Sequence, residues 1–283
     1  MTTPHIASAP LIAVADAKIA GAVVYWTGEG SVQYARLTAA WVASSLDDGL
    51  LPSPVTPLVA LHRALKSFCD ATTDVRPLRG DRTGYVLVTE HYTKSDPRPT
   101  YTNGAEVTLR EDGALAVSGA DDPTAVYTTY ERHRELLDAQ DISHWLCALV
   151  RGVQSTRLRE RGGVYFVPRH TLEVWRAYVA AIRSVSQHSI YEIPALPSSE
   201  AVRAILDAIT AEAQETANDL LDDLCEGDFA QQRKVDSRKQ RAAAMEKKLA
   251  QYEELLGARL DTMREKLLTI QAQYAAIILG GES

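Results

Sequence analysis

The C-terminal part of the chain constrains the fold most, because from Ser198 onward it contains no proline and is rich in Ala, Glu, Lys, Leu and Arg. This composition is typical of long helices. Apolar side chains recur there at steps of three and four, which is the pattern of a coiled-coil seam with one local phase shift. The seam needs a partner, either a helix of the same chain or another subunit. Its residues are Leu249, Tyr252, Leu256, Leu260, Met263, Leu267, Ile270, Tyr274 and Ile277.

One break is expected in this helical region, at Gly227, because glycine ends helices and Asp228 with Gln231 resembles a capping box. We therefore predict a helical hairpin with arms at residues 199–226 and from 229 to about 279. The second arm would be about 75 Å long at 1.5 Å per residue. It would overhang the first arm and leave the end of the seam uncovered, which is the main sequence argument for self-association.

Opposite charges are segregated between the two predicted arms. Residues 200–228 carry nine carboxylates against one arginine, and residues 229–248 carry seven basic side chains against two carboxylates. Antiparallel arms would pair these blocks and select the register. One continuous helix would instead leave the basic block available to nucleic-acid phosphates. The candidate residues of that block are Arg233, Lys234, Arg238, Lys239 and Arg241.

The region before residue 198 carries strand and helix signals in alternation. Asp112 and Gly113 favour a tight turn, which predicts a β-hairpin across residues 106–117. Capping residues, twice followed by proline, predict the helices between the strands. The expected helix starts are Ser31, Thr56, Asp122, Asp141 and Thr171. Further strands are expected at residues 22–26, 84–92, 164–167 and 189–193.

These patterns predict an α+β fold class with two parts. Residues 1–197 form a small mixed α/β domain with antiparallel strands, within which a further boundary near residues 120–140 is left open. Residues 198–283 form a long C-terminal helical hairpin or coiled coil that turns near residue 227. Pro194 and Pro197 mark the boundary between the two parts, because proline stiffens the backbone and removes a hydrogen-bond donor.

A second basic cluster precedes the long helices and contains a single acid, Glu160, between residues 151 and 169. A helix, a glycine turn and a short strand would present these guanidinium groups to a nucleic-acid backbone much as a winged helix does. Surface arginines are also common on helices, so a solvated face is the alternative interpretation. The residues of the cluster are Arg151, Arg157, Arg159, Arg161 and Arg169.

No catalytic residue, metal site or cofactor is predicted, and the chain is not expected to be an enzyme. The segment from Gly28 to Ser31 lies between a predicted strand and helix, but it lacks the further residues of either phosphate-binding motif. A turn with a helix cap is favoured there. The seven histidines and three cysteines show no metal-type spacing.

Composition and targeting signals narrow the remaining function classes. The net charge of −7 argues against a surface that is cationic throughout. The widely spaced Cys69, Cys147 and Cys225 are expected to be buried free thiols, as in a reducing compartment. The first twenty residues lack a basic start, and no apolar run is long enough for a membrane span. We therefore expect a cytoplasmic protein with no membrane partner.

The run from Arg161 to Pro168, Arg-Gly-Gly-Val-Tyr-Phe-Val-Pro, is followed by a predicted helix, the proline boundary and the long helical tail. In this arrangement, over residues 140 to 275, the chain resembles an uncharacterised family of phage and bacterial proteins. The resemblance implies no established activity and no catalytic residue. Its association with mobile elements favours a role in phage assembly, DNA handling or host defence.

Two function hypotheses follow from the sequence. The first is a non-enzymatic scaffold or interaction protein that forms homo-oligomers through the C-terminal seam. The alternative is a nucleic-acid-binding protein that uses the arginine clusters at 151–169 and 233–248. The sequence identifies neither the ligand nor the number of subunits.

Overall fold

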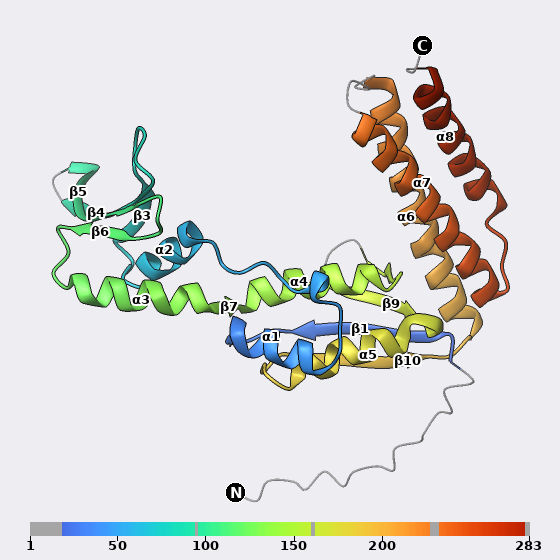
Figure 1. Cartoon of the computed structure of the whole chain (residues 1–283), viewed down its shortest axis with the longest axis horizontal. Helices are drawn as coiled ribbons and strands as arrows, with labels where there is room; N and C mark the ends of the chain where they lie inside the picture. Colours follow the sequence, from blue (N-terminus) through green and yellow to red (C-terminus); the bar gives the residue numbers. More distant parts are fainter. Residues whose placement is uncertain (1–18, 94–95, 160–161, 227–231, 281–283) are drawn as a thin grey trace, which may run out of the picture. The chain divides into compact units, whose positions relative to one another are not determined.

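The computed structural model describes residues 19–93, 96–159, 162–226 and 232–280 (Figure 1). The chain forms two compact units, each assembled from segments that are distant in sequence. Of the described residues, the first unit comprises those up to Thr27, Leu146–Val179 and those from Ser189 onward. The second unit comprises Gly28–Trp145 and Ala180–His188. The boundary predicted after residue 197 therefore lies inside the first unit.

The first unit contains a four-stranded antiparallel sheet in the order β10-β1-β9-β8. Gly21 pairs with Ala195 on one side and with Pro168 on the other, so β1 lies in the middle of the sheet. A Cβ at Gly21 would lie 2.1 Å from the carbonyl oxygen of Val167, which explains the glycine at this position. The strands are β1 (Gly21–Thr27), β8 (Thr156–Arg157), β9 (Val164–Pro168) and β10 (Ser189–Ala195).

Helices α4 (Ala139–Gly152) and α5 (Arg169–Arg183) flank β8 and β9 in sequence. The ring of Trp26 on β1 stacks on Tyr165 at 5.6 Å between centroids. The prediction that Thr171 caps α5 is wrong, because the helix already begins at Arg169. The Thr171 hydroxyl instead donates to the carbonyl of Val153 at 2.7 Å.

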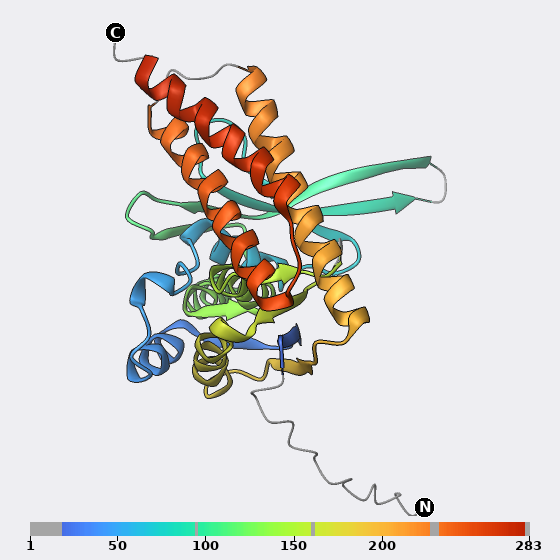
Figure 2. The ribbon, with the colours of Figure 1, turned by 90° about the vertical axis from the view of Figure 1, so that its right-hand side faces the viewer.

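Three long helices complete the first unit and lie side by side (Figure 2). They are α6 (Ser199–Glu226), α7 (Gln232–Leu256) and α8 (Asp261–Gly280). The prediction of one continuous second arm is wrong: α7 ends before Gly257, which takes a φ of +64°, a conformation that glycine adopts readily. The backbone amide of Leu260 then donates to the carboxylate of Glu253, which fixes the start of α8.

Ion pairs along α6 and α7 establish that these two helices are antiparallel. Arg241 bonds to Asp219 at 2.7 Å and Lys248 bonds to Glu212 at 2.6 Å, so positions that rise along one helix fall along the other. Arg238 pairs with Asp223 in the same register. The predicted pairing of acidic and basic blocks is therefore confirmed by these contacts. The predicted turn at Gly227 lies outside the described residues.

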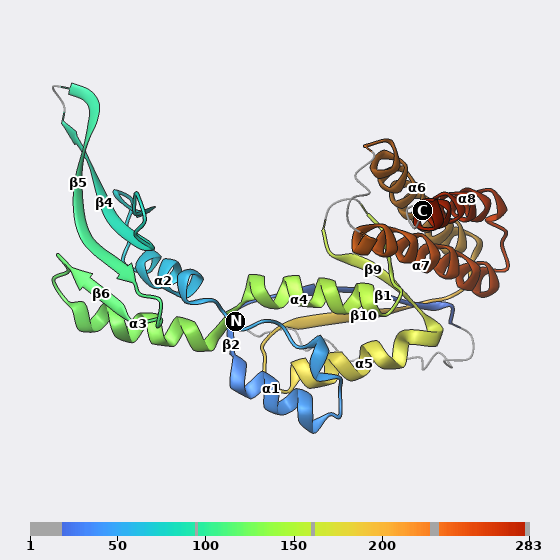
Figure 3. The same cartoon turned by 45° about the horizontal axis from the view of Figure 1, so that its top comes forward.

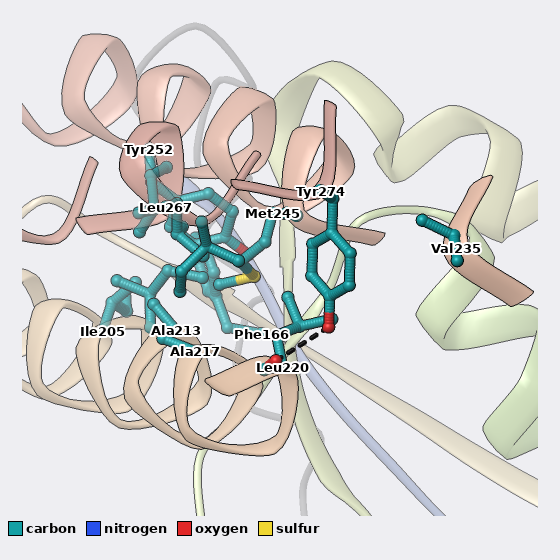
Figure 4. Close-up of a cluster of buried hydrophobic side chains, with 14 of the residues drawn as sticks. Phe166, Ile205, Ala213, Ala217, Leu220, Val235, Met245, Tyr252, Leu267 and Tyr274 are labelled. Carbon is teal, nitrogen blue, oxygen red and sulfur yellow. Dashed lines mark hydrogen bonds between the residues drawn. The ribbon is translucent and has the colours of Figure 1, made fainter. Parts of the chain in front are cut away.

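Most of the predicted seam is buried inside the three-helix bundle (Figure 4). The hydroxyl of Tyr274 donates to the carbonyl of Leu220 on α6 at 2.8 Å, so α8 also contacts the first arm. The predicted overhang is wrong, because α8 folds back and the seam finds its partner within the chain. Leu249, Tyr252, Leu267, Ile270 and Tyr274 are fully buried, and Leu256, Leu260, Met263 and Ile277 are half-buried against the same core.

The bundle core continues onto the sheet of the first unit, beside β9 (Figure 3). Phe166 on β9 is fully buried and meets the ring of Tyr252 edge-on at 6.1 Å. The hydroxyl of Tyr252 donates to the carbonyl of Gln154, just before β8. These contacts fix the bundle against β8 and β9.

The second unit contains an antiparallel sheet in the order β3-β4-β5-β6, with α2 and α3 on one face (Figure 1). The predicted strand at 84–92 and hairpin at 106–117 are confirmed, and Gly113 takes the expected positive φ of +82°. Thr56 and Asp122 cap the two helices as predicted. The elements are β3 (Thr73–Pro77), β4 (Gly84–Thr93), β5 (Asp96–Leu109), β6 (Leu115–Ser118), α2 (Pro57–Lys66) and α3 (Pro123–Glu135).

A short strand pair lies at the start of the second unit, where β2 (Ser31–Gln33) pairs with β7 (Leu136–Asp138). The prediction that Ser31 caps a helix is wrong, because Ser31 belongs to this strand pair. Helix α1 (Tyr34–Ala43) follows it without a side-chain cap, and a short 3₁₀ turn spans Asp48–Leu50. The pairing partner is more than a hundred residues away, so local sequence favoured the helix.

His188 is buried in the second unit and is 3% exposed. Its ring lies against Gly28, where an added Cβ would be 2.6 Å from Nε2. Burial lowers the pKa of His188, and the backbone of Ala139 partly opposes this shift. Burial also lowers the pKa of His133 in the same unit. The fold therefore favours the neutral form of both imidazoles.

These two histidines make the stability of the second unit depend on pH. An unfolded imidazole titrates near about 6.5, so below that pH the unfolded chain binds more protons than the folded chain. We expect the free energy of unfolding to fall as the pH drops from about 7.5 to 5. His188→Gln should flatten this slope, whereas His144→Gln, at an exposed position, should leave it unchanged. Urea unfolding at several pH values measures both; equal slopes in the two variants would contradict the assignment.

Candidate functional site

Three arginines of the predicted cluster meet at one cavity of the first unit. Arg151 comes from the end of α4, Arg157 from β8 and Arg159 from the segment after it, and together they line a cavity of about 1030 Å³. All three side chains are exposed. Within the part of the chain that the structure describes, no ion pair joins any of them to a carboxylate. Among the described residues, no direct contact with a carboxylate compensates their positive charge at the cavity.

The backbone after α4 explains why these arginines converge. Gln154 takes a positive φ of 59°, which is unusual for a residue other than glycine and turns the chain sharply into β8. Arg157 then pairs with Tyr165 on β9. Burial and a hydrogen bond to Cys147 raise the pKa of Tyr165, while the nearby Arg151 and Arg157 oppose that shift. Both guanidinium groups thus lie close enough to Tyr165 to influence its charge.

Helix α6 contributes four carboxylates to the lining, those of Asp207, Glu212, Glu215 and Asp219. Two of its four carboxylates are neutralised, Asp219 by Arg241 and Glu212 by Lys248. Asp207 and Glu215 have no ion-pair partner within the described ranges. The lining therefore combines arginines and carboxylates that have no ion-pair partner among the described residues.

A buried lysine contacts both the segment before β8 and helix α6: Lys248 bonds to Ser155 and to Glu212. The side chain of Lys248 is only 11% exposed, and its ammonium group donates to Glu212 Oε1 and to the carbonyl of Ser155, both at 2.6 Å. Burial lowers the pKa of Lys248, and Glu212 opposes this shift. The ion pair holds the Glu212 carboxylate in one position beside β8.

Two oxygen atoms next to this ion pair are buried without a hydrogen-bond partner among the described residues. They are Oε2 of Glu212 and Oγ of Ser155, and both residues line the cavity. Ser155 is 4% exposed. A buried polar atom without a partner is costly, so such atoms in a cavity indicate groups that a ligand can satisfy.

The other predicted arginines lie elsewhere. Arg169 lines a separate cavity of about 530 Å³ beside His170, Gln251 and Glu254. Arg161 lies outside the described residues. The structure therefore brings together three of the five arginines of this cluster.

The second basic cluster, in the block at residues 233–248, contains both ion-paired and exposed side chains. Arg238 and Arg241 form ion pairs with α6, and Arg241 also lines the cavity. Arg233, Lys234 and Lys239 are exposed. The cluster thus contributes one residue to the candidate site.

Sequence reasoning missed Ser155, Glu212 and Lys248. Lys248 follows another lysine in a charged run, which is the usual pattern of a solvated helix face. Its burial comes from β8, which packs against α6. No local signal distinguishes these residues from ordinary surface residues.

The sequence also predicts the burial of the cysteines and the absence of membrane helices and metal sites. Cys225 is exposed, so the expectation of a buried thiol is wrong there, while Cys69 and Cys147 are half-buried. Within the described ranges, no helix is long and apolar enough to cross a membrane. The same ranges contain no group of three or more His, Cys, Asp or Glu side chains placed to hold a metal ion.

Comparison with known proteins gives one assignment. No curated protein and no solved structure matches the chain. A family model matches residues 19–279, which include both compact units and the cavity. The chain therefore belongs to a family of unknown function, DUF6744.

Proposed function

We propose that the chain binds nucleic acid, with Arg151, Arg157 and Arg159 contacting backbone phosphates. The observation that carries this proposal is the convergence of three exposed guanidinium groups on one cavity, each without an ion-pair partner in the described residues. A guanidinium group offers a planar fork of donors that matches the oxygens of a phosphate. An unpaired guanidinium group contributes more binding free energy to an anionic ligand than a guanidinium group that is already paired with a carboxylate.

Negative charge elsewhere on the chain restricts nucleic-acid binding to this site. The net charge of −7 and the carboxylates of α6 oppose a nucleic acid that spreads over the surface. The site would therefore hold a short stretch of backbone rather than wrap a long one. The resemblance of residues 161–168 to phage and bacterial proteins adds support for a role in DNA handling.

Self-association through the C-terminal seam has lost its main support. Self-association was expected from an uncovered end of the second arm, but that end packs against α6 and α7 in a single chain, where Leu267, Ile270 and Tyr274 are fully buried. We therefore do not propose the seam as an oligomer interface. The role of the protein as a scaffold stays a prediction of the sequence alone.

Fluorescence anisotropy with a labelled single-stranded oligonucleotide tests the proposal. We expect binding at low salt, and an affinity that decreases as salt increases. Three phosphate contacts predict a slope of about −2 for the logarithm of the affinity against the logarithm of the salt concentration. Absence of binding at 20 mM salt, or an affinity independent of salt, would contradict the proposal.

A further inference from the structure

The carboxylates that line the cavity call for an explanation beyond phosphate binding. The arginines suit the phosphate backbone of a nucleic acid. The carboxylates of α6 would repel a ligand that consisted of phosphate alone. Asp207 and Glu215 lack ion-pair partners among the described residues, and Glu212 Oε2 and Ser155 Oγ lack hydrogen-bond donors there. A ligand that satisfies both sets of residues must therefore carry anionic groups as well as hydrogen-bond donors.

We infer that the cavity accepts unpaired nucleotides and selects bases that carry an exocyclic amino group. This inference rests on the proposed function. An unpaired nucleotide carries both a phosphate and a free base edge, so it can meet the arginines and the acceptors that line the same cavity. A base in a duplex uses one amino hydrogen for pairing and presents the other only in the major groove, on a double helix that the cavity is too small to enclose.

The size of the cavity agrees with a few nucleotides. At about 1030 Å³ it lies at the upper end of small-molecule sites, which span roughly 300–1,000 Å³. It is too small to enclose a double helix. Enzymes that act on bases solve the same problem by taking the base out of the stack.

The acceptors determine which bases fit. Carboxylates accept from the N4 amino group of cytosine, whereas thymine presents the O4 acceptor at the corresponding position. A carboxylate facing O4 would be repelled and left without a donor. Glu212 is well suited to this role, because Lys248 occupies Oε1 and leaves Oε2 without a partner in the described residues. Ser155 Oγ adds a second acceptor beside it.

The test compares oligo(dC) with oligo(dT) of the same length on the full chain. Measurements at pH 8 keep cytosine unprotonated, and a mixed-sequence duplex serves as a third ligand. We expect oligo(dC) to bind about tenfold more tightly than oligo(dT), which lies within the discrimination that one good base contact supplies, and the duplex to bind most weakly. Equal affinity for the two oligonucleotides, or tighter duplex binding, would overturn this inference while leaving the proposed function intact. No binding by any ligand would overturn the proposed function itself.

Variants assign the selectivity to the cavity. Ser155→Ala and Glu215→Gln should bring the ratio of the two affinities toward one, with folding checked by circular dichroism. Glu215 is exposed, so its substitution avoids the destabilisation expected from breaking the Glu212–Lys248 pair. Glu254→Gln is the matched control, because Glu254 is an exposed carboxylate that lines the other cavity. An unchanged ratio in both cavity variants would contradict the assignment.

Discussion

Replacing Arg151, Arg157 and Arg159 together with alanine is expected to weaken oligonucleotide binding by about 100-fold at 0.1 M salt. The reason is that each arginine is assigned one phosphate, and each lost contact removes the release of about 0.7 counterion from a single strand. The salt dependence should become nearly flat at the same time. Anisotropy titrations of the wild type and the triple variant between 20 and 200 mM salt measure both effects.

A matched triple variant separates site-specific loss from a general change of charge. Arg79, Arg110 and Arg259 are exposed and do not line the cavity, and their replacement changes the net charge by the same amount. We expect this variant to bind within about threefold of the wild type, because these three arginines do not line the cavity and salt at 0.1 M screens exposed charges that make no direct contact with the ligand. Equal losses in the two triple variants would show that the cavity is not the binding site.

Leu267→Ala is expected to destabilise the protein by about 3 kcal/mol, whereas Leu268→Ala should change stability by no more than about 0.5 kcal/mol. Leu267 is fully buried in the bundle core, and the adjacent Leu268 is 50% exposed. The same chemical change therefore creates a cavity at one position and removes surface at the next. Urea unfolding monitored by circular dichroism gives the two values.

This pair also tests the return of α8 along the bundle. If residues 232–280 formed one straight helix without cover, both leucines would be partly exposed and the two substitutions would cost similar amounts. A small effect of Leu267→Ala would therefore contradict the three-helix arrangement. Light scattering at several concentrations should accompany the measurement, because a seam buried within one chain predicts stability that does not depend on protein concentration.

Features that depend on neighbouring residues could be predicted from the sequence. Asp112 and Gly113 identified the hairpin of β5 and β6, and Thr56 with Pro57 identified the start of α2. The opposite charges of the two arms identified the antiparallel register of α6 and α7. In each case the physical cause acts within a turn or along one helix face.

Features that depend on distant residues could not be predicted from the sequence. The pairing of β2 with β7 overrode a capping signal at Ser31, and nothing near β1 indicates that β9 and β10 are its neighbours. The break after Leu256 was missed because the apolar steps continue across it. Two helices that face the same core show the same periodicity as one continuous helix, so only Gly257 marked the turn.

The candidate site was predictable in part. Composition identified the arginine cluster, but only the fold separates Arg169 from the three arginines that share a cavity. The burial of Lys248 and Ser155 arises where β8 meets the long helices. From the sequence alone, a polar side chain is assigned to the solvent-exposed surface, because its neighbours in space are unknown.

Photo-cross-linking tests the central claim most directly. Oligo(dC) that carries 5-iodocytosine is irradiated with the full chain, and the modified peptides are identified by mass spectrometry. We expect adducts in residues 151–159 and 204–219, the segments that contribute most of the cavity lining, and their loss in the triple arginine variant. Adducts confined to the second unit, or to the cavity beside Arg169, would contradict it.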